Sequence, residues 1–257
     1  MKKNIWTREQ EIIVFNLYCT ISFQQSSKMH PDVMRIAELI GRTPSAVNLK
    51  IGNFGSFDPV LKEKGIVGLT HASKLDKEIW EEFNGKWDEL SYVSEQLIAN
   101  LQGKELSFES EDRLPNIPIG TTRELIIKQR INQNFFRKVI LASYHNSCCI
   151  TGLSNSELLV ASHIKPWCES DASEKTNPQN GLLLNSLHDK AFDKGFITIT
   201  PDLSIKTSSH LSDIYNGETI QKFFSEYSGR KIIMPEKFAP DKIFLEYHND
   251  VIFEKWK

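Results

Sequence analysis

The sequence predicts an α+β protein, with a helical N-terminal part followed by a compact unit of two short strands and a helix. In the N-terminal part, apolar residues recur at helical spacing. Two short apolar runs, 157–164 and 182–184, are bounded by turn-forming residues and indicate strands. A polar, proline-containing stretch, 103–120, separates the two patterns. We therefore expect residues 1–110 to form a helical domain and residues 111–257 to form a second domain.

The composition is that of a packed protein that folds in water. Hydrophobic residues make up 40% and charged residues 25% of the 257 residues. The net charge is −2, whereas nucleic-acid-binding proteins are often basic, so the total charge does not favour that class. Local basic runs matter more for phosphate binding than the total does. No apolar run reaches the roughly 18 residues of a membrane span, and the N-terminus lacks a signal-peptide pattern. We expect a soluble, cytoplasmic protein with no membrane partner.

The four cysteines, Cys19, Cys148, Cys149 and Cys168, form no C-x-x-C pair. This spacing argues against a structural zinc site built on two such pairs. Reduced thiols fit the expected cytoplasmic location.

The N-terminal part contains the signals of two successive helices. Residues 5–20 suit a buried helix that Thr7 can cap, with Gln10 completing a capping box. Residues 32–40 predict a second helix that ends at Gly41.

A third helix is predicted after Thr43, an N-cap residue that Pro44 follows at the first helical position. Two helices joined by a short glycine-containing turn form a helix-turn-helix-like pattern, whose second helix can enter a major groove. The DNA-binding candidates of this region are Arg42, Ser45, Asn48 and Lys50. A small helical bundle that binds no nucleic acid explains the pattern equally well, and both interpretations stay open.

Two further helical stretches are predicted at 73–102 and 121–145. The second carries the main basic cluster, which includes Arg130 and Arg137. Such a cluster is either a solvated helix face or a surface that contacts phosphates.

The two predicted strands and the helix after them carry the polar residues of interest. His163 ends the first strand, and Asn180 precedes the second in an Asn-Gly turn signal. Asn185 can cap the following helix, which contains His188 and ends at Gly195. Beyond it we expect a hairpin over residues 196–206 and a final helix packed on the same core.

This region resembles the HNH, or ββα-metal, endonucleases, and within them a subgroup of predicted bacterial restriction endonucleases. The resemblance spans 148–195, with a weaker likeness from about 123 to the C-terminus. It is carried by Cys149-Ile150-Thr151-Gly152, Ala161-Ser162-His163-Ile164-Lys165-Pro166-Trp167, Asn177-Pro178-Gln179-Asn180-Gly181-Leu182-Leu183-Leu184, and Leu187-His188 with Phe192-Asp193-Lys194-Gly195. The segments Trp6-Thr7-Arg8-Glu9 and Gly41 to Val47 are similar, more weakly, to a domain that precedes such nucleases. The implied fold is a helix-turn-helix-like domain followed by a ββα-metal HNH nuclease domain.

The resemblance implies a role for each polar residue. His163 is the general base that activates water, a task suited to an imidazole with a pKa near 6.5. Asn180 orients that imidazole or reaches the metal through its side-chain oxygen. His188 ligates one divalent cation, which stabilises the developing charge. Lys165 contacts phosphate, and the products carry 5′-phosphate and 3′-hydroxyl ends.

One position departs from the family pattern. Many members place an acidic or histidine ligand immediately before the base, where this sequence has Ser162. The cation then needs another ligand, and Asp193 is the candidate. Asp193 lies five positions after His188, about 140° around an ideal helix. Asp189 is the alternative, but adjacent helical residues diverge by about 100°.

The leading functional prediction is a restriction-type endonuclease that acts on double-stranded DNA. Magnesium is the default cation, with manganese, nickel and zinc left open. One HNH site cuts one strand, so a homodimer is the economical arrangement. The alternatives are a nonspecific or nicking nuclease, and a DNA-binding regulator with an inactive nuclease fold. The recognition sequence and any dependence on base modification are not encoded in a readable motif.

Overall fold

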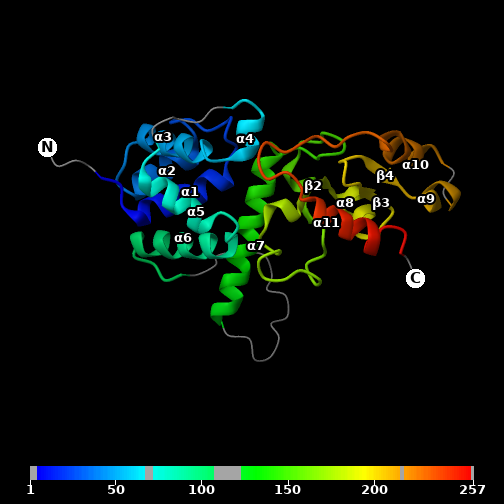
Figure 1. Cartoon of the computed structure of the whole chain (residues 1–257). Helices are drawn as coiled ribbons and strands as arrows, with labels where there is room; N and C mark the ends of the chain where they lie inside the picture. The colour runs from blue at the N-terminus through cyan, green and yellow to red at the C-terminus, as the bar shows by residue number, and fades with distance from the viewer. Residues whose placement is uncertain (1–4, 67–71, 107–122, 215–216, 256–257) are drawn as a thin grey trace. The chain divides into compact units, whose positions relative to one another are not determined.

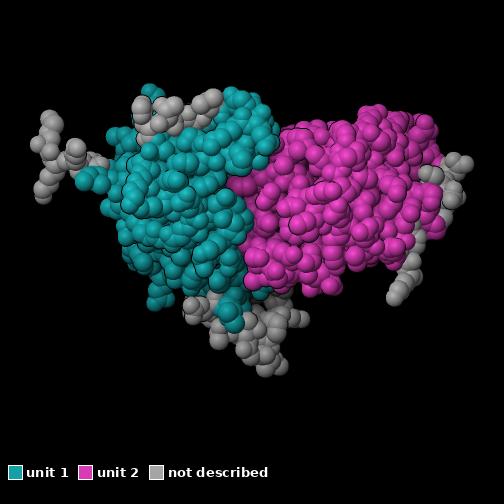
Figure 2. Space-filling model, in the orientation of Figure 1, with its two compact units in different colours: residues 1–139 teal, residues 140–257 magenta. Residues whose placement is uncertain are grey.

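The computed structural model describes residues 5–66, 72–106, 123–214 and 217–255. The chain divides into two compact units, residues 1–139 and residues 140–257 (Figures 1 and 2). The division falls inside a long helix, α7, Arg123–Ser143. The predicted boundary near residue 110 lies outside the described residues, as does most of the predicted linker 103–120. Nothing in the described part of the chain is a helix long and apolar enough to cross a bilayer.

The first unit is a helical bundle arranged around α1. Helix α1 contacts α2, α3, α5 and α6, and apolar residues are buried around most of its circumference. The helices that precede α7 are α1 (Arg8–Thr20), α2 (Pro31–Leu39), α3 (Pro44–Gly55), α4 (Pro59–Glu63), α5 (Lys74–Phe83) and α6 (Trp87–Leu101).

The predicted helix starts in this unit are confirmed. Thr7 and Gln10 form the expected capping box of α1, and the Thr43 side chain caps α3 at the backbone N–H of Ala46. Gly41 follows α2 with a φ of +67°, a left-handed conformation that glycine adopts without steric cost.

The stretch 73–102 differs from the prediction, because it forms two helices rather than one. Helix α5 ends at Phe83, and α6 begins at Trp87. Gly85 lies between them with a φ of +94°, which an α-helix does not contain. The apolar residues on both sides of the break keep helical spacing, so their pattern did not reveal the turn.

The second unit contains the predicted strand–loop–strand–helix. Strands β1 (Leu159–His163) and β2 (Gly181–Asn185) pair in an antiparallel hairpin, and α8 (Ser186–Asp193) follows directly and contacts both. Asn185 caps α8 as predicted, and Gly195, with a φ of +68°, ends it. A side chain at Gly195 would collide with the Ile252 backbone, so this position requires glycine for close packing as well.

The rest of the second unit encloses this core. A second hairpin, β3 (Ile197–Ile199) and β4 (Ile205–Thr207), confirms the predicted one. Two short helices follow, α9 (Ser209–Ile214) and α10 (Glu218–Phe223). The predicted final helix is present but short, as α11 (Lys242–Tyr247) continued by a π-helical turn, His248–Ile252.

Candidate functional site

The hairpin fixes the backbone on which the candidate site is built. His163 lies opposite Gly181, and Ser162 lies opposite Leu182. Successive residues of a strand point to opposite faces, so Ser162 and His163 diverge. Ser162 is buried near helix α8, whereas the ring of His163 is partly exposed at the strand end.

The ring of His163 is held by the loop that joins the two strands. Its Nε2 lies 3.0 Å from the carbonyl oxygen of Lys175, and the ring packs edge-on against Trp167. A carbonyl oxygen can only accept, so Nε2 carries the proton and the neutral ring has its lone pair on Nδ1. Burial lowers the pKa of His163 below 6.5, although the Lys175 carbonyl partly offsets this. The ring is therefore neutral near pH 7, the state that a general base requires.

Asn180 is fully buried and organises the same loop. Its side-chain oxygen accepts from the Lys165 N–H at 2.8 Å. Its amide nitrogen donates to the Lys165 and Glu174 carbonyl oxygens, at 3.3 and 3.2 Å. The amide thus ties both ends of the segment between residues 165 and 174. The Asn180 amide thereby positions the residues around the Lys175 carbonyl. Its oxygen is occupied by a backbone N–H and does not face an open site where a metal could bind.

His188 lies in a different environment from His163. The ring is buried, with Nε2 2.8 Å from the Phe223 carbonyl oxygen and Nδ1 3.0 Å from Oδ1 of Asn185. It also packs against Phe224 and Tyr227. Both ring nitrogens therefore face protein oxygens, an arrangement that suits a structural histidine and not the expected metal ligand. Burial lowers the pKa of His188 below its ordinary value.

Two carboxylates lie on α8, and one of them, Asp189, is near Ser162. Asp189 and Asp193 are four residues apart and share a helix face, with Asp189 half-buried and Asp193 exposed. Burial raises the pKa of Asp189, and the nearby Ser162 hydroxyl lowers it in part. Desolvation and then the charge of Asp189 raise the pKa of Asp193. Burial is the largest cause of both pKa shifts, and the charge of Lys190 offsets part of each.

The Ser162 hydroxyl and the carboxylates of α8 bear on whether this region could hold a metal ion. Among the described residues, its buried oxygen has no hydrogen-bond partner of good geometry. Within the same residues, no group of three or more histidine, cysteine or acidic side chains is placed to hold a metal ion. Magnesium, however, is commonly held by one or two carboxylates, with water and substrate phosphate completing its shell. The pair on α8 fits that cation and not a site with four protein ligands. Of the three expected ligands, His188 and Asn180 are engaged with protein atoms, and Asp193 shares a face of α8 with Asp189.

Lys165 does not stand free for a phosphate. Its Nζ lies 2.6 Å from Oε2 of Glu174 and 5.5 Å from the centre of the Tyr247 ring. The ion pair raises the pKa of Lys165 and closes the loop that Asn180 organises. The sequence pattern missed Glu174 and the Lys175 carbonyl, because neither is set apart by residue type or spacing.

In the first unit, the environment of Lys50 does not suit the DNA contact that the sequence predicts. Lys50 is 5% exposed, and its Nζ contacts Glu11 Oε1 at 3.0 Å and Asp76 Oδ1 more closely. Asn53 also donates to Asp76, at 2.7 Å. A buried ammonium is tolerated when carboxylates neutralise it, and this one is fully engaged inside the bundle.

The other DNA-binding candidates also differ from expectation. The Arg42 guanidinium donates to the Ile5 carbonyl at 2.6 Å and to Gln10 at 2.7 Å, and it stacks over Trp6. It thereby fastens the N-terminal segment. On α3, Ser45 is exposed and Asn48 half-buried, but the charged side chain of this helix, Lys50, points inward. Helix α3 therefore presents no lysine or arginine side chain to DNA, although the helix-turn-helix-like interpretation required one. The other two candidates, Arg130 and Arg137 on α7, are half-exposed.

A comparison with known families finds a match, and it lies within the second unit. Residues 148–200 match the family model described as HNH endonuclease. The match contains β1, β2 and α8 and covers about a fifth of the chain. It supports an HNH endonuclease domain in this region and indicates a nuclease with DNA as a substrate. No curated protein matches the chain.

Proposed function

We propose that the protein is a metal-dependent endonuclease of restriction type, which hydrolyses phosphodiester bonds in duplex DNA to leave 5′-phosphate and 3′-hydroxyl ends. The observation that carries the proposal is local. Within the segment similar to HNH endonucleases, the hairpin presents a neutral histidine of fixed tautomer, and α8 presents two carboxylates on one helix face. A base and a cation site are the two requirements for hydrolysis of a phosphodiester by water.

His163 is the general base in this proposal. Its Nδ1 accepts a proton from water, and the Lys175 carbonyl stabilises the imidazolium that results. Asn180 acts through the loop as a positioning residue. His188 holds α8 to the segment around Phe223 and is assigned a structural role.

Asp189 and Asp193 would hold a divalent cation, and magnesium or manganese suits their hard oxygen ligands best. When bound, such a cation supplies charge stabilisation for the phosphate and the leaving oxygen. The carboxylates project from successive turns of one helix, so both could contact one cation. Of the expected DNA contacts, we keep Arg130 and Arg137 in the proposal. One HNH site cuts one strand, so we also keep a homodimer as the economical way to cut both strands.

The test is digestion of modified and unmodified phage DNA with magnesium, by the wild-type chain and by His163→Ala. Loss of a general base lowers the rate by about 10²–10⁴-fold. Discrete fragments support the restriction type, whereas a smear or nicks alone support a nonspecific or nicking nuclease. DNA binding without cleavage, with magnesium, manganese, nickel or zinc, supports an inactive nuclease fold.

A matched control separates the base from the protein's other imidazoles. His210 is an exposed histidine of the second unit, outside the hairpin and α8. His210→Ala should cleave at the wild-type rate. Equal rates for His163→Ala and wild type would remove the assignment of His163.

A further inference from the structure

The loop between β1 and β2 contains Lys175, a cation to which the proposed function assigns no role beyond its backbone carbonyl. The loop has a second lysine, Lys165, and the two differ in what neutralises them. Lys165 is paired with Glu174 at 2.6 Å, whereas no carboxylate within the described ranges lies at ion-pair distance from the Lys175 ammonium. The loop therefore keeps one of its two positive charges uncompensated.

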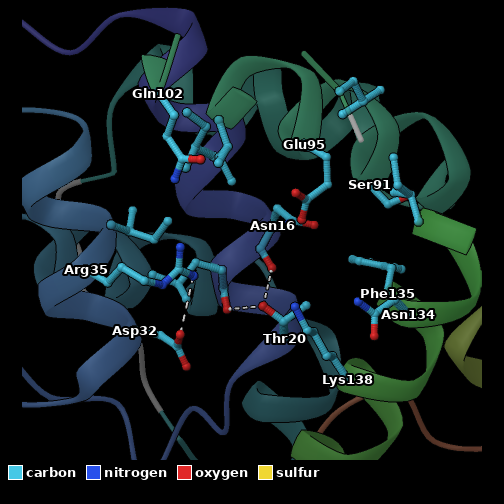
Figure 3. Close-up of a pocket in the computed structure, with 16 residues that line it drawn as sticks. Asn16, Thr20, Asp32, Arg35, Ser91, Glu95, Gln102, Asn134, Phe135 and Lys138 are labelled. Carbon is cyan, nitrogen blue, oxygen red and sulfur yellow. Dashed lines mark hydrogen bonds and ion pairs between the residues drawn. The ribbon is translucent and has the colours of Figure 1, made fainter. Parts of the chain in front are cut away.

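Arg35 of the first unit shows the contrasting case of a neutralised cation. It lines a cavity of about 630 Å³ among α1, α2, α6 and α7, and its guanidinium is paired with Asp32 at 3.4 Å (Figure 3). An anion that approached Arg35 would compete with that carboxylate. At Lys175, an anion meets no such competitor among the residues that the structure describes.

An aromatic ring, and not a carboxylate, holds the Lys175 side chain. Its Nζ lies 5.2 Å from the centre of the Trp167 ring, within the range of a cation–π contact. The ring has no net charge, so the ammonium keeps its positive charge and can still donate hydrogen bonds. Because the contact restricts a flexible side chain in advance, less conformational entropy is lost when an anion binds.

The same residue lies beside the proposed base. The Lys175 carbonyl accepts from Nε2 of His163 at 3.0 Å, and the Trp167 ring meets the His163 ring edge-on, with the ring centres 5.4 Å apart. Burial lowers the pKa of His163 most, and the charge of Lys175 lowers it further, as a nearby cation does. His163, Trp167 and Lys175 are each partly exposed, so they form one accessible surface.

The position of this surface indicates which anion it meets. It lies within residues 148–200, the segment that matches the HNH endonuclease model. A DNA strand that brings a phosphodiester to His163 also brings its backbone phosphates to the neighbouring side chains. A lysine binds a phosphate as a point charge, without reading the base sequence.

We propose that Lys175, oriented by Trp167, binds a backbone phosphate of DNA next to His163. The inference rests on the proposed function, because it takes DNA as the ligand and His163 as the base. Lys175 touches the substrate directly, and Trp167 is a positioning residue.

The test measures binding of a short DNA duplex to the full chain over a range of salt concentrations, without divalent cations. Each phosphate that a protein neutralises adds about 0.9 to the slope of log affinity against log salt. Lys175→Met keeps an aliphatic stem beside Trp167 and removes the charge. It should reduce the slope by about 0.9 and weaken binding by up to about tenfold at low salt.

Variants of Trp167 test the positioning role. Trp167→Leu should weaken binding by about threefold, because the lysine is no longer ordered before DNA arrives. Trp167→Phe keeps a ring face and should bind DNA nearly as the wild type does. Equal affinities for Trp167→Leu and the wild type would remove the role of Trp167 as the positioning residue.

Lys206→Met is the matched control, since Lys206 also lies over an aromatic ring, 5.0 Å from the centre of Phe253. It is an exposed lysine of β4 in the same unit, outside the β1–β2 hairpin and α8. Lys206→Met should keep the slope and the affinity of the wild type. A wild-type slope in Lys175→Met, or an equal loss in Lys206→Met, would overturn the proposal.

The binding measurement is independent of cleavage, so it separates this inference from the nuclease proposal. Cleavage by the wild type, together with an unchanged slope in Lys175→Met, removes the phosphate contact and leaves the nuclease. A reduced slope in Lys175→Met, together with no cleavage by the wild type, supports the contact and removes the nuclease. A wild-type chain that binds no duplex overturns the contact, and digestion then decides the nuclease proposal by itself.

Discussion

The acidic pair Glu11 and Asp76 in the first unit and the pair Asp189 and Asp193 in the second differ in what neutralises them. In the first unit, Glu11 and Asp76 are buried against the Lys50 ammonium. In the second, Asp189 and Asp193 share a face of α8 and form no ion pair within the described residues. The first cluster carries its own cation and is structural. The second has only the charges of Lys190 and Lys194 nearby, with no ion pair among the described residues, and this is why we propose it as the site for a cation from solution.

The most direct way to break this comparison is to neutralise the α8 pair with Asp189→Asn and Asp193→Asn. We expect cleavage to fall by about a thousandfold, because cation binding supplies several kcal/mol of charge stabilisation. The melting temperature without metal should stay constant or rise, since repulsion between the carboxylates is removed. Added magnesium should raise it in the wild type and not in the variant.

Asp250→Asn provides the control for that experiment, because Asp250 is an exposed carboxylate of the same unit outside the pair. It should retain both cleavage and the thermal response to magnesium. An unchanged magnesium response in the double variant would show that the cation binds elsewhere.

The second prediction applies the opposite change to the first unit. Lys50→Met should lower the free energy of unfolding by about 3 kcal/mol, since it leaves two carboxylates buried without their cation. Chemical denaturation measures this change. The control is Lys77→Met, which removes a lysine from an exposed pair with Glu81 and should cost about 0.2–1 kcal/mol. Similar losses in both variants would show that the buried cluster is not the structural element inferred here.

The third prediction sharpens the comparison through pH. Burial raises the pKa of Glu11 to about 7, and the neighbouring Asp76 adds to the shift. A raised pKa in the folded state means that the folded protein binds the proton more tightly than the unfolded chain does. Its contribution to stability is complete below pH 4.5 and is lost as pH rises through about 7. The wild type should therefore lose stability between pH 5 and pH 8 relative to Glu11→Gln, in paired denaturation curves at each pH. Parallel curves would refute the raised pKa.

The difference between the clusters also shows what the sequence could predict. The hairpin, α8 and their caps follow from local signals, namely Asn180-Gly181, Asn185 and Gly195, and all are present. The position of His163 at the strand end was predictable for the same reason. These features depend on residues close together in the chain, where backbone preference acts directly.

Long-range pairing was not predictable in this way. Lys50 looked like an exposed cation because its partners, Glu11 and Asp76, are distant in sequence. His188 looked like a ligand because its contact with the Phe223 carbonyl depends on a segment 35 residues away. A residue type indicates what a side chain can do, whereas its partners decide whether it is available.

The smallest expected effect concerns Lys165. Its ion pair with Glu174 is mostly but not fully buried, so it is intermediate between the buried Lys50 cluster and the α8 carboxylates, which form no ion pair among the described residues. If the pair only closes the loop, Lys165→Met and Glu174→Gln should each lower stability by about 1 kcal/mol or less. The salt dependence of DNA binding should then be the same as in the wild type. If Lys165 leaves Glu174 to contact a phosphate, Lys165→Met should reduce the slope of log affinity against log salt by about one, while Glu174→Gln should not. Salt titrations of DNA binding on both variants distinguish these outcomes, because a loop contact and a phosphate contact differ in the counterions that they release.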